Sequence, residues 1–364
     1  MRRAGSVPLE AGGVRRVRVV FRALVVAVVA ILAVAAARVE ARAEASSHRI
    51  EGGFRNSGGI PGHGNAPARV TLPFFLRRVA SSLSWAKVPA PPVVANDGAF
   101  LRANAVASVP TVTWVGHSTL LVQMGHVTFL TDPTWSSTAS PVALGPRRFV
   151  EPGLRMEDLP AVDFVVVSHN HYDHMDLDTL RTLADKGTRI FVPLGNARTL
   201  RSAGIGNVEE LDWWQQRSVK RVAIHCVPAR HWSRRGLFDG DRALWSGWVV
   251  VAEDRRFYFA GDTGAFAGFA EIGDRLGPFD LAAVPIGAYE PQAMMKPAHL
   301  NPEEAVAAAT AARAAKSVAV HFGTFDLSDE PIDEPPKRFR AASLAAGRGE
   351  TQDWLLAIGE TRQW

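Results

Sequence analysis

The chain has 364 residues, of which 47% are hydrophobic and 21% charged, an ordinary composition for a globular protein of one large domain or two small ones. The formal net charge of +5 would suit a nucleic-acid-binding protein, but residues 1–43 alone carry eight arginines against two glutamates. Residues 44–364 are therefore close to neutral, which argues against a nucleic-acid partner. The single cysteine, Cys226, excludes an intramolecular disulfide, and we expect it to be a buried apolar residue.

The first 43 residues have the layout of a signal peptide. Several arginines precede the uncharged residues 23–37, and Ala41-Arg42-Ala43 then offers a cleavage site with small residues. The uncharged run is shorter than the roughly 20 residues that span a bilayer. We therefore predict that residues 1–43 are a cleaved signal peptide, with a retained N-terminal membrane anchor as the alternative. Either form predicts export to the periplasm or association with the cell envelope.

Residues 44–108 form a segment rich in Gly, Pro, Ala and Ser, which favours extended and loop structure. The run Phe74-Phe75-Leu76 and the aromatic Trp85 indicate that this segment packs on something, and residues 72–85 have room for a short helix. We therefore predict an N-terminal extension over residues 44–108 that packs on a folded domain of residues 109–364.

From Pro110 onward, apolar runs separated by Gly and Pro predict a succession of strands. They cover residues 111–115, 119–124, 127–131, 164–168, 189–192, 221–228, 244–252, 257–260, 281–285 and 317–321. Helices are predicted between them at residues 177–186, 197–203 and 302–315. The last helix has Asn301 as a favourable N-cap and Pro302 at its first position. Many strands with interspersed helices, and no Rossmann glycine fingerprint, predict a layered α/β domain.

Four potential metal ligands lie within the six-residue run His169-Asn170-His171-Tyr172-Asp173-His174, which follows the apolar residues 164–167. Buried imidazoles and carboxylates are costly without a partner, and this combination suits zinc, with iron or manganese as alternatives. A hydrophilic turn is the other interpretation, but three histidines and an aspartate in one turn favour metal. The spacing indicates two ions, because His169 and His171 can face one way while Asp173 and His174 face another.

Three later residues each follow a predicted strand and are candidates for further ligands: His231, Asp262 and His321. Polar groups at strand ends are where sites in α/β proteins are usually built. Taken singly, Asp262 could be a turn former, His231 could stack on Trp232, and His321 could be a core histidine. Two ions need about eight ligand positions including water, and these residues nearly complete them.

Together these residues resemble the metallo-β-lactamase fold family, because Asp132, the HxHxDH run and the three later ligands follow in the family's order. The resemblance extends from about residue 110 to the carboxyl end. It implies an α/β fold of the four-layer αβ/βα sandwich type. Within the superfamily the chain is similar to the branch of N-acylphosphatidylethanolamine-hydrolysing phospholipases D. The similar segments include Trp114-Val-Gly-His-Ser-Thr119, Pro228-Ala-Arg-His-Trp-Ser-Arg-Arg235 and His321-Phe-Gly-Thr-Phe325.

The resemblance implies a ligand set for two zinc ions. The implied ligands of one ion are His169, His171 and His231. Those of the other are Asp173, His174 and His321, and Asp262 would bridge the two ions. Asp132 would lie behind the ligands and orient one of the histidines, as such carboxylates do.

The resemblance also implies the reaction. N-acylphosphatidylethanolamine would be cleaved to an N-acylethanolamine and phosphatidic acid by a hydroxide that the two ions share. Asp173 is a candidate catalytic residue as well as a ligand. The leaving alkoxide needs a proton, for which His117 and His299 are candidates, although either could equally be structural. A phosphoryl group near His299 would also be favoured by the helix that begins at Pro302.

A phospholipid or other phosphodiester substrate predicts contact with a membrane surface, and the branch suggests a homodimer. Candidates for an apolar groove or for bilayer contact are Phe74, Phe75, Leu76, Trp85 and Trp213-Trp214, with core packing as the alternative for each. Arg234 and Arg235 could meet lipid phosphates or form a solvated loop. A lactonase or phosphodiesterase acting on a soluble substrate is the alternative enzyme. A metal-stabilised binding protein is disfavoured, because a structural zinc needs only four ligands.

Overall fold

The structure is a computed structural model that describes residues 48–60, 62, 66–82, 91–142 and 145–364. The predicted signal peptide or anchor at residues 1–43 and the aromatic Trp85 lie outside the described residues. None of the helices in this part of the chain combines the length and the hydrophobicity that crossing a membrane requires. Residues from His48 onward belong to one structural unit.

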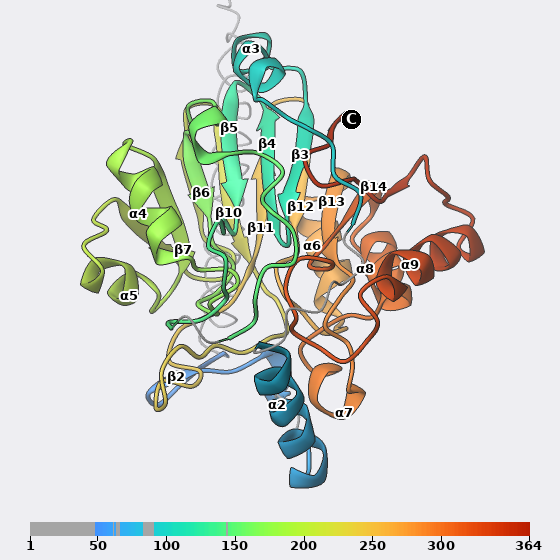
Figure 1. The fold of residues 1–364 in the computed structure, drawn as a ribbon. Helices are drawn as coiled ribbons and strands as arrows, with labels where there is room; N and C mark the ends of the chain where they lie inside the picture. The colour runs from blue at the N-terminus through green and yellow to red at the C-terminus, as the bar shows by residue number, and fades with distance from the viewer. Residues whose placement is uncertain (1–47, 61, 63–65, 83–90, 143–144) are drawn as a thin grey trace, which may run out of the picture. The chain divides into compact units, whose positions relative to one another are not determined.

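Two seven-stranded sheets pack face to face in the middle of this unit (Figure 1). The first sheet has the spatial order β16 (Thr361–Gln363), β3 (Thr111–Gly116), β4 (Thr119–Met124), β5 (Val127–Thr131), β6 (Phe164–Val166), β7 (Arg189–Pro193) and β8 (Val208–Leu211). The second has the order β15 (Asp353–Trp354), β14 (Ala314–Val320), β13 (Phe279–Pro285), β12 (Arg256–Phe259), β11 (Gly247–Val251), β10 (Val222–Val227) and β9 (Gln216–Val219). Each sheet is antiparallel in one half and parallel in the other, the change falling at β5 and at β12.

Helices cover the outer face of each sheet (Figure 1). The first sheet is covered by α4 (Leu177–Asp185) and α5 (Ala197–Ser202), and the second by α6 (Gly268–Leu276), α8 (Pro302–Ala311) and α9 (Glu334–Ala345). This arrangement is the four-layer αβ/βα sandwich that the sequence predicted. Outside the layers lie α2 (Ala68–Ser82), α3 (Ala99–Ala107), α7 (Gln292–Met295) and a small hairpin of β1 (Arg49–Ile50) and β2 (Gly53–Phe54).

Alternating side chains along the strands separate the two sides of the first sheet. In β6, Phe164 and Val166 belong to the hydrophobic cluster between the sheets. Val165 belongs to a second cluster, which it shares with Leu180 and Leu183 of α4. Because both faces of β6 are buried, its sequence is a continuous apolar run rather than an alternating one.

The structure contains a strand at every predicted position and a helix at each of the three. The predicted helix over residues 302–315 ends earlier, at Ala311, because β14 already begins at Ala314. Asn301 does cap this helix, and its side chain and that of Glu304 form a reciprocal capping box. The prediction omitted β8 and β9, because the polar sequences of these outer strands have no clear hydrophobic pattern.

The described part of residues 44–108 makes buried hydrogen bonds to the sandwich. His48 Nε2 lies 2.8 Å from Asp212 Oδ1. The amide of Asn56 is buried and makes four hydrogen bonds. Its Nδ2 donates to the carbonyls of Ile60 (3.1 Å) and His231 (2.9 Å). Its Oδ1 accepts from the backbone N–H of His231 (3.0 Å) and from Trp245 Nε1 (2.8 Å).

Replacing Asn56 with Ala should lower the free energy of unfolding by about 2–4 kcal/mol, because it leaves buried backbone groups of His231 without partners. Urea denaturation of the two proteins measures this difference. Asn207 is a matched control, since its amide bonds two backbone carbonyls at an exposed position. Asn207→Ala should cost less than about 1 kcal/mol. Equal effects of the two substitutions would contradict the prediction.

Candidate metal centre

Loops that follow the strands of both sheets bring histidines and aspartates together at one edge of the sandwich. The run of residues 169–174 follows β6, and further residues follow β3, β5, β10, β12 and β14. The residues that meet there are His117, Asp132, His169, His171, Asp173, His174, His231, Asp262, His299 and His321. All of them are buried except His171, which is partly exposed.

One group consists of three histidines whose ring nitrogens converge. His171 Nδ1 lies 2.8 Å from His169 Nε2 and 3.3 Å from His231 Nε2. The opposite nitrogen of His169 lies 2.9 Å from the hydroxyl of Ser168, and that of His231 lies 2.9 Å from the carbonyl oxygen of Ala298. These outer contacts set the ring orientations, so that the inner nitrogens face one point.

A second group contains Asp173, His174 and His321. Asp173 Oδ2 lies 3.1 Å from His174 Nε2 and 3.5 Å from His321 Nε2. Asp262 Oδ2 lies between the groups, at 3.1 Å from His174 Nε2, 3.0 Å from His321 Nε2 and 3.9 Å from His231 Nε2. The structure thus brings together all seven residues predicted as ligands, and Asp262 lies between the two groups.

Asp132 lies behind the second group and is fully buried. Its carboxylate accepts hydrogen bonds from the backbone N–H and the hydroxyl of Ser168, both at 2.6 Å. Its Oδ2 also lies 2.6 Å from His174 Nδ1. Asp132 therefore orients His174 directly, and through Ser168 it also supports His169.

The donor set fits divalent metal ions. His174 Nε2, His321 Nε2 and Asp262 Oδ1 are buried and make no hydrogen bond with acceptable geometry. The nearest imidazole nitrogens and carboxylate oxygens are close to these atoms but are not aligned as hydrogen-bond partners. This arrangement is expected of side chains that point at a common ion. Imidazole nitrogens and carboxylate oxygens suit zinc, iron or manganese. These residues could therefore hold divalent metal ions.

The protonation states of the cluster also depend on burial and mutual attraction. Burial opposes ionisation of Asp173 and Asp262, yet the surrounding histidines hold the pKa of both carboxyls well below the ordinary value. Burial lowers the pKa of His174, but three neighbouring carboxylates outweigh it and raise the pKa well above the ordinary value. The same competition raises the pKa of His321 to about 9. Without metal, the neighbouring carboxylates therefore favour the protonated forms of both imidazoles.

The two candidate proton donors both lie in the cluster, but their surroundings differ. His117 Nε2 is 2.9 Å from Asp173 Oδ2, so this ring supports a ligand carboxylate. His299 Nδ1 is buried without a hydrogen-bond partner and lies 3.8 Å from Asp262 Oδ2. Burial lowers the pKa of His117 to about 3 and that of His299 to about 4, so both rings are neutral near pH 7.

The backbone of the site adopts conformations that ordinary residues avoid. His117, Asp132 and His321 have φ values of 51°, 35° and 60°. Gly261, with φ of 62°, allows the end of β12 to approach the end of β6, since a Cβ there would lie 2.7 Å from the Cβ of Ser168 and from the carbonyl oxygen of Ser246. This close approach brings Asp262 to the histidine run.

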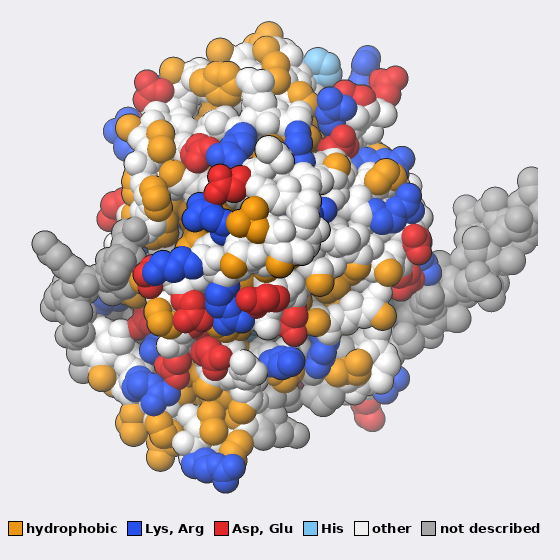
Figure 2. Space-filling model, turned by 90° about the vertical axis from the view of Figure 1, so that its right-hand side faces the viewer, with side chains coloured by type: hydrophobic (Ala, Val, Ile, Leu, Met, Phe, Trp, Pro, Cys, Tyr) orange, Lys and Arg blue, Asp and Glu red, His pale blue; other side chains and the backbone are white. Residues whose placement is uncertain are grey.

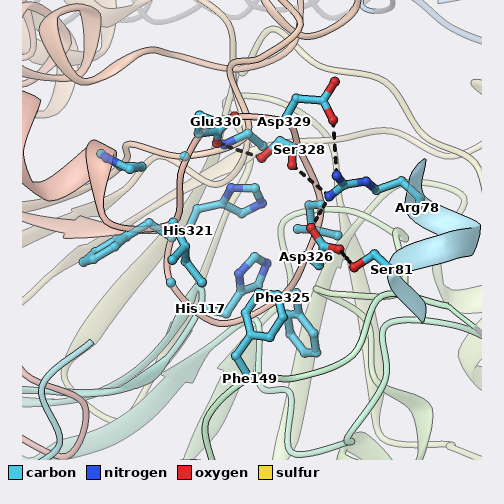
Figure 3. A pocket seen from close by; sticks show the side chains of 17 residues that line it. Arg78, Ser81, His117, Phe149, His321, Phe325, Asp326, Ser328, Asp329 and Glu330 are labelled. Atoms are coloured by element: carbon cyan, nitrogen blue, oxygen red, sulfur yellow. Dashed lines mark hydrogen bonds and ion pairs between the residues drawn. The ribbon is translucent and has the colours of Figure 1, made fainter. Parts of the chain in front are cut away.

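A cavity of about 260 Å³ opens beside the second group (Figure 3). His117 and His321 line one side, together with the aromatic side chains of Phe149 and Phe325. The opposite wall carries charged and polar groups: Arg78, Ser81, Asp326, Ser328, Asp329 and Glu330. The carboxylates of this wall are satisfied within the protein. Asp326 and Asp329 pair with Arg78, and Glu330 accepts backbone N–H groups of residues 288 and 290.

The sequence analysis did not identify the structural roles of three residues that hold the predicted metal ligands in place. Asn56 bonds the backbone of His231, Ser168 links Asp132 to His169, and Arg235 contacts the histidine run. The sequence analysis had expected Arg235 either to meet lipid phosphates or to form a solvated loop. The position of Ser168 just before His169 was a usable signal, whereas Asn56 lies 175 residues from its partner and has none.

Comparison with known proteins supports the fold. The model of the β-lactamase superfamily domain matches residues 127–322. An N-acyl-phosphatidylethanolamine-hydrolyzing phospholipase D of Caenorhabditis elegans is 46% identical over 59% of this chain and 64% of its own length. The mitochondrial enzyme of the same description from Saccharomyces cerevisiae is 36% identical over 62% of this chain and 50% of its own length. The chain thus matches less than two thirds of either relative.

Among solved structures, a metallo hydrolase of the archaeon Ignicoccus hospitalis has the same fold. It superimposes with a TM-score of 0.55 and 23% identity, over 70% of this chain and 98% of its own. Fold and site together define a protein of the metallo-β-lactamase fold whose clustered histidines and aspartates are able to hold metal. The chain belongs to the β-lactamase superfamily, and it is similar to N-acyl-phosphatidylethanolamine-hydrolyzing phospholipases D.

Metal binding to the metal-free protein should release protons at pH 7. His174 and His321 are both protonated there, since the pKa of each is raised, and an ion must displace a proton from each ligand nitrogen. The apparent affinity should rise about tenfold per pH unit for each proton released, and the contribution of His321 should disappear above about pH 9. Calorimetric titration with Zn²⁺ in buffers of different ionisation enthalpy counts the protons. Zero release at pH 7 would contradict this assignment.

Proposed function

We propose that the chain is a zinc-dependent phospholipase D-type enzyme that hydrolyses N-acylphosphatidylethanolamine to an N-acylethanolamine and phosphatidic acid. The observation that carries the proposal is the cluster of seven ligands in a chain that is 46% identical to an enzyme of this description. The complete set of implied ligands is compatible with two ions. A lactonase or a phosphodiesterase for soluble substrates would use the same cluster, so the substrate must be tested directly.

The cavity suits a substrate whose charged group meets the metals and whose remainder is less polar. Phe149, Phe322 and Phe325 line it beside His117 and His321. The acidic wall does not attract a phosphate, and its arginine is already paired with carboxylates. A phosphodiester would therefore be oriented by its attraction to the cations at the cluster rather than by this wall.

Each site residue then has a defined task. Histidines 169, 171 and 231 would hold one ion, Asp173, His174 and His321 the other, and Asp262 would contact both. When bound, the ions neutralise charge on the phosphoryl oxygens and lower the pKa of water. Asp132 keeps His174 in the required tautomer through the contact at Nδ1. His117 holds the carboxylate of Asp173, and His299 is a neutral ring whose Nδ1 can hold a proton near Asp262.

The helix α2 offers a surface for contact with a membrane. Its residues Leu72, Phe75, Leu76 and Val79 follow the helical spacing i, i+3, i+4, i+7 and are each about 60% exposed. Figure 2 shows hydrophobic side chains gathered at the lower end of the unit, where α2 lies in Figure 1. An outward apolar stripe of this kind is unusual for a helix exposed to water and is typical of an interaction surface.

The opposite side of α2 faces the protein, where Arg78 lies over the ring of the buried Phe74. Arg78 pairs with Asp326 and Asp329 and donates to the carbonyl oxygen of Ser328 at 2.8 Å, while Ser81 bonds Asp326 (Figure 3). Arg78 and Ser81 also line the cavity beside the metal cluster. One helix therefore has its apolar face outward and its polar face at the cavity, which favours a lipid surface as the outer partner.

The other residues predicted for membrane contact do not lie on the surface in the same way. Phe74 and Trp213 are buried, and Trp214 is half-buried with Arg275 over its ring.

The substrate is tested by offering the Zn²⁺-loaded protein N-acylphosphatidylethanolamine in vesicles, a soluble phosphodiester and a lactone in parallel. We expect phosphatidic acid and N-acylethanolamine as products, identified by mass spectrometry. His171→Ala should lower kcat/KM by at least about 100-fold, because a ligand is removed. The exposed His126, changed to Asn, should leave kcat/KM unchanged. Lactone turnover without phosphodiester turnover would overturn the phospholipase assignment.

The membrane surface is tested with the double substitution of Phe75 and Leu76 by Ser. Loss of two apolar side chains from the stripe should weaken binding to phosphatidylcholine vesicles about tenfold or more, as measured by sedimentation. Turnover of a soluble phosphodiester should not change. The matched control replaces Phe100 and Val106 of α3, which are also exposed but lie at the other end of the unit (Figure 1). Equal loss of binding in both variants would contradict a specific role for α2.

A further inference from the structure

The run of ligand residues is held by a second loop of the protein. Arg235 lies in the loop after β10, four residues beyond His231. Its Nη1 donates to the carbonyl oxygen of Asn170 at 3.0 Å and to that of Met175 at 2.9 Å. These two carbonyls lie at the two ends of the segment that carries His171, Asp173 and His174.

Tyr172 completes the contact between the loops. The guanidinium carbon of Arg235 lies 4.0 Å from the centre of the Tyr172 ring. In the other direction, the Tyr172 hydroxyl donates to the backbone carbonyl oxygen of Arg235 at 2.8 Å. The Arg235 side chain therefore contacts the loop of Tyr172, and the Tyr172 side chain contacts the loop of Arg235. We call this pair of contacts the Arg235–Tyr172 clasp.

The backbone of the loop that carries Arg235 is held in place by Asp239. The carboxylate of Asp239 accepts the backbone N–H groups of Arg235 at 3.1 Å and of Gly236 at 2.7 Å. This turn sets the position from which the guanidinium reaches the ligand run. Among the described residues, the neighbouring Arg234 donates within its own loop, to the carbonyl oxygens of Gly236 and Leu237.

We propose that Arg235 is a positioning residue for the metal centre, and that the Arg235–Tyr172 clasp sets the spacing between the loop of His231 and the loop of His171, Asp173 and His174. His231 and His171 belong to the same three-histidine group but come from different loops. Their relative position depends on contacts between the loops, and the clasp bridges them on the outer side of the ligands. Partners behind metal ligands are known to change metal affinity strongly when they are removed. The proposal concerns metal binding and is independent of the substrate.

The test measures Zn²⁺ affinity of the full-length protein by competition with a chromophoric chelator. Arg235→Met keeps the length of the side chain but removes its donors, and it should weaken Zn²⁺ binding by about 10- to 100-fold. Tyr172→Phe keeps the ring but removes one hydrogen bond, and it should weaken binding by about 2- to 10-fold. The two effects should be less than additive in the double variant, because each substitution opens the same clasp.

Arg234→Met is the matched control and should leave Zn²⁺ affinity within about twofold of the unchanged protein, since it alters only its own loop. The visible spectrum of the Co²⁺-loaded protein should change in Arg235→Met and not in Arg234→Met, because the spectrum reports ligand geometry. If Arg235→Met does not fold, as judged by circular dichroism, Tyr172→Phe and Arg235→Lys provide the same comparison. Unchanged Zn²⁺ affinity and Co²⁺ spectrum in the folded variants would overturn the proposal, as would a rise in KM for phosphodiester as the only effect, since Arg235 would then contact substrate.

Discussion

The structure depends on the burial of two carboxylates, Asp173 and Asp262, among histidines at the edge of two sheets. A buried carboxylate is strongly unfavourable unless opposite charge and hydrogen-bond donors surround it. Here His174 and His321 provide the opposite charge, His117 Nε2 lies 2.9 Å from Asp173 Oδ2, and Asp132 supports His174 from behind. Because each group is tolerated only in the presence of the others, the loops that carry them must close together. The same balance leaves places where divalent ions can replace protons, which is the basis for a hydrolytic centre.

The sandwich makes this assembly possible by presenting the ends of its strands at one edge. Both sheets change from antiparallel to parallel pairing, so strands β6, β12 and β14 lie in the parallel halves, and the loops after them supply ligands. The site therefore draws on both sheets, and Gly261 permits the close approach of the two at Ser168. Strained backbone at His117, Asp132 and His321 is tolerated because hydrogen bonds on several sides hold these residues.

Elements outside the sandwich complete the site. Asn56 fixes the backbone of His231 from the N-terminal extension, and Arg235 fixes the ligand run from the loop after β10. Helix α2 contributes Arg78 and Ser81 to the wall of the cavity and turns its apolar residues outward. The extension is thus part of the site rather than a tether. Its contacts connect the metal cluster to the outward apolar residues of α2, which form the surface that we propose for contact with a membrane.

Much of the fold was predictable from the sequence because buried strands such as β6 and capped helices such as α8 have strong local signals. The ligands were predictable because the HxHxDH run is dense and because His231, Asp262 and His321 each follow an apolar strand. Local sequence could not reveal β8 and β9, whose polar residues pair only because a neighbouring strand offers an edge. Nor could it reveal Asn56 or the Arg235–Tyr172 clasp, and it left open whether Phe75 and Leu76 face outward or pack in the core. These features arise from contacts between segments far apart in the chain, and only the tertiary structure decides which segments meet.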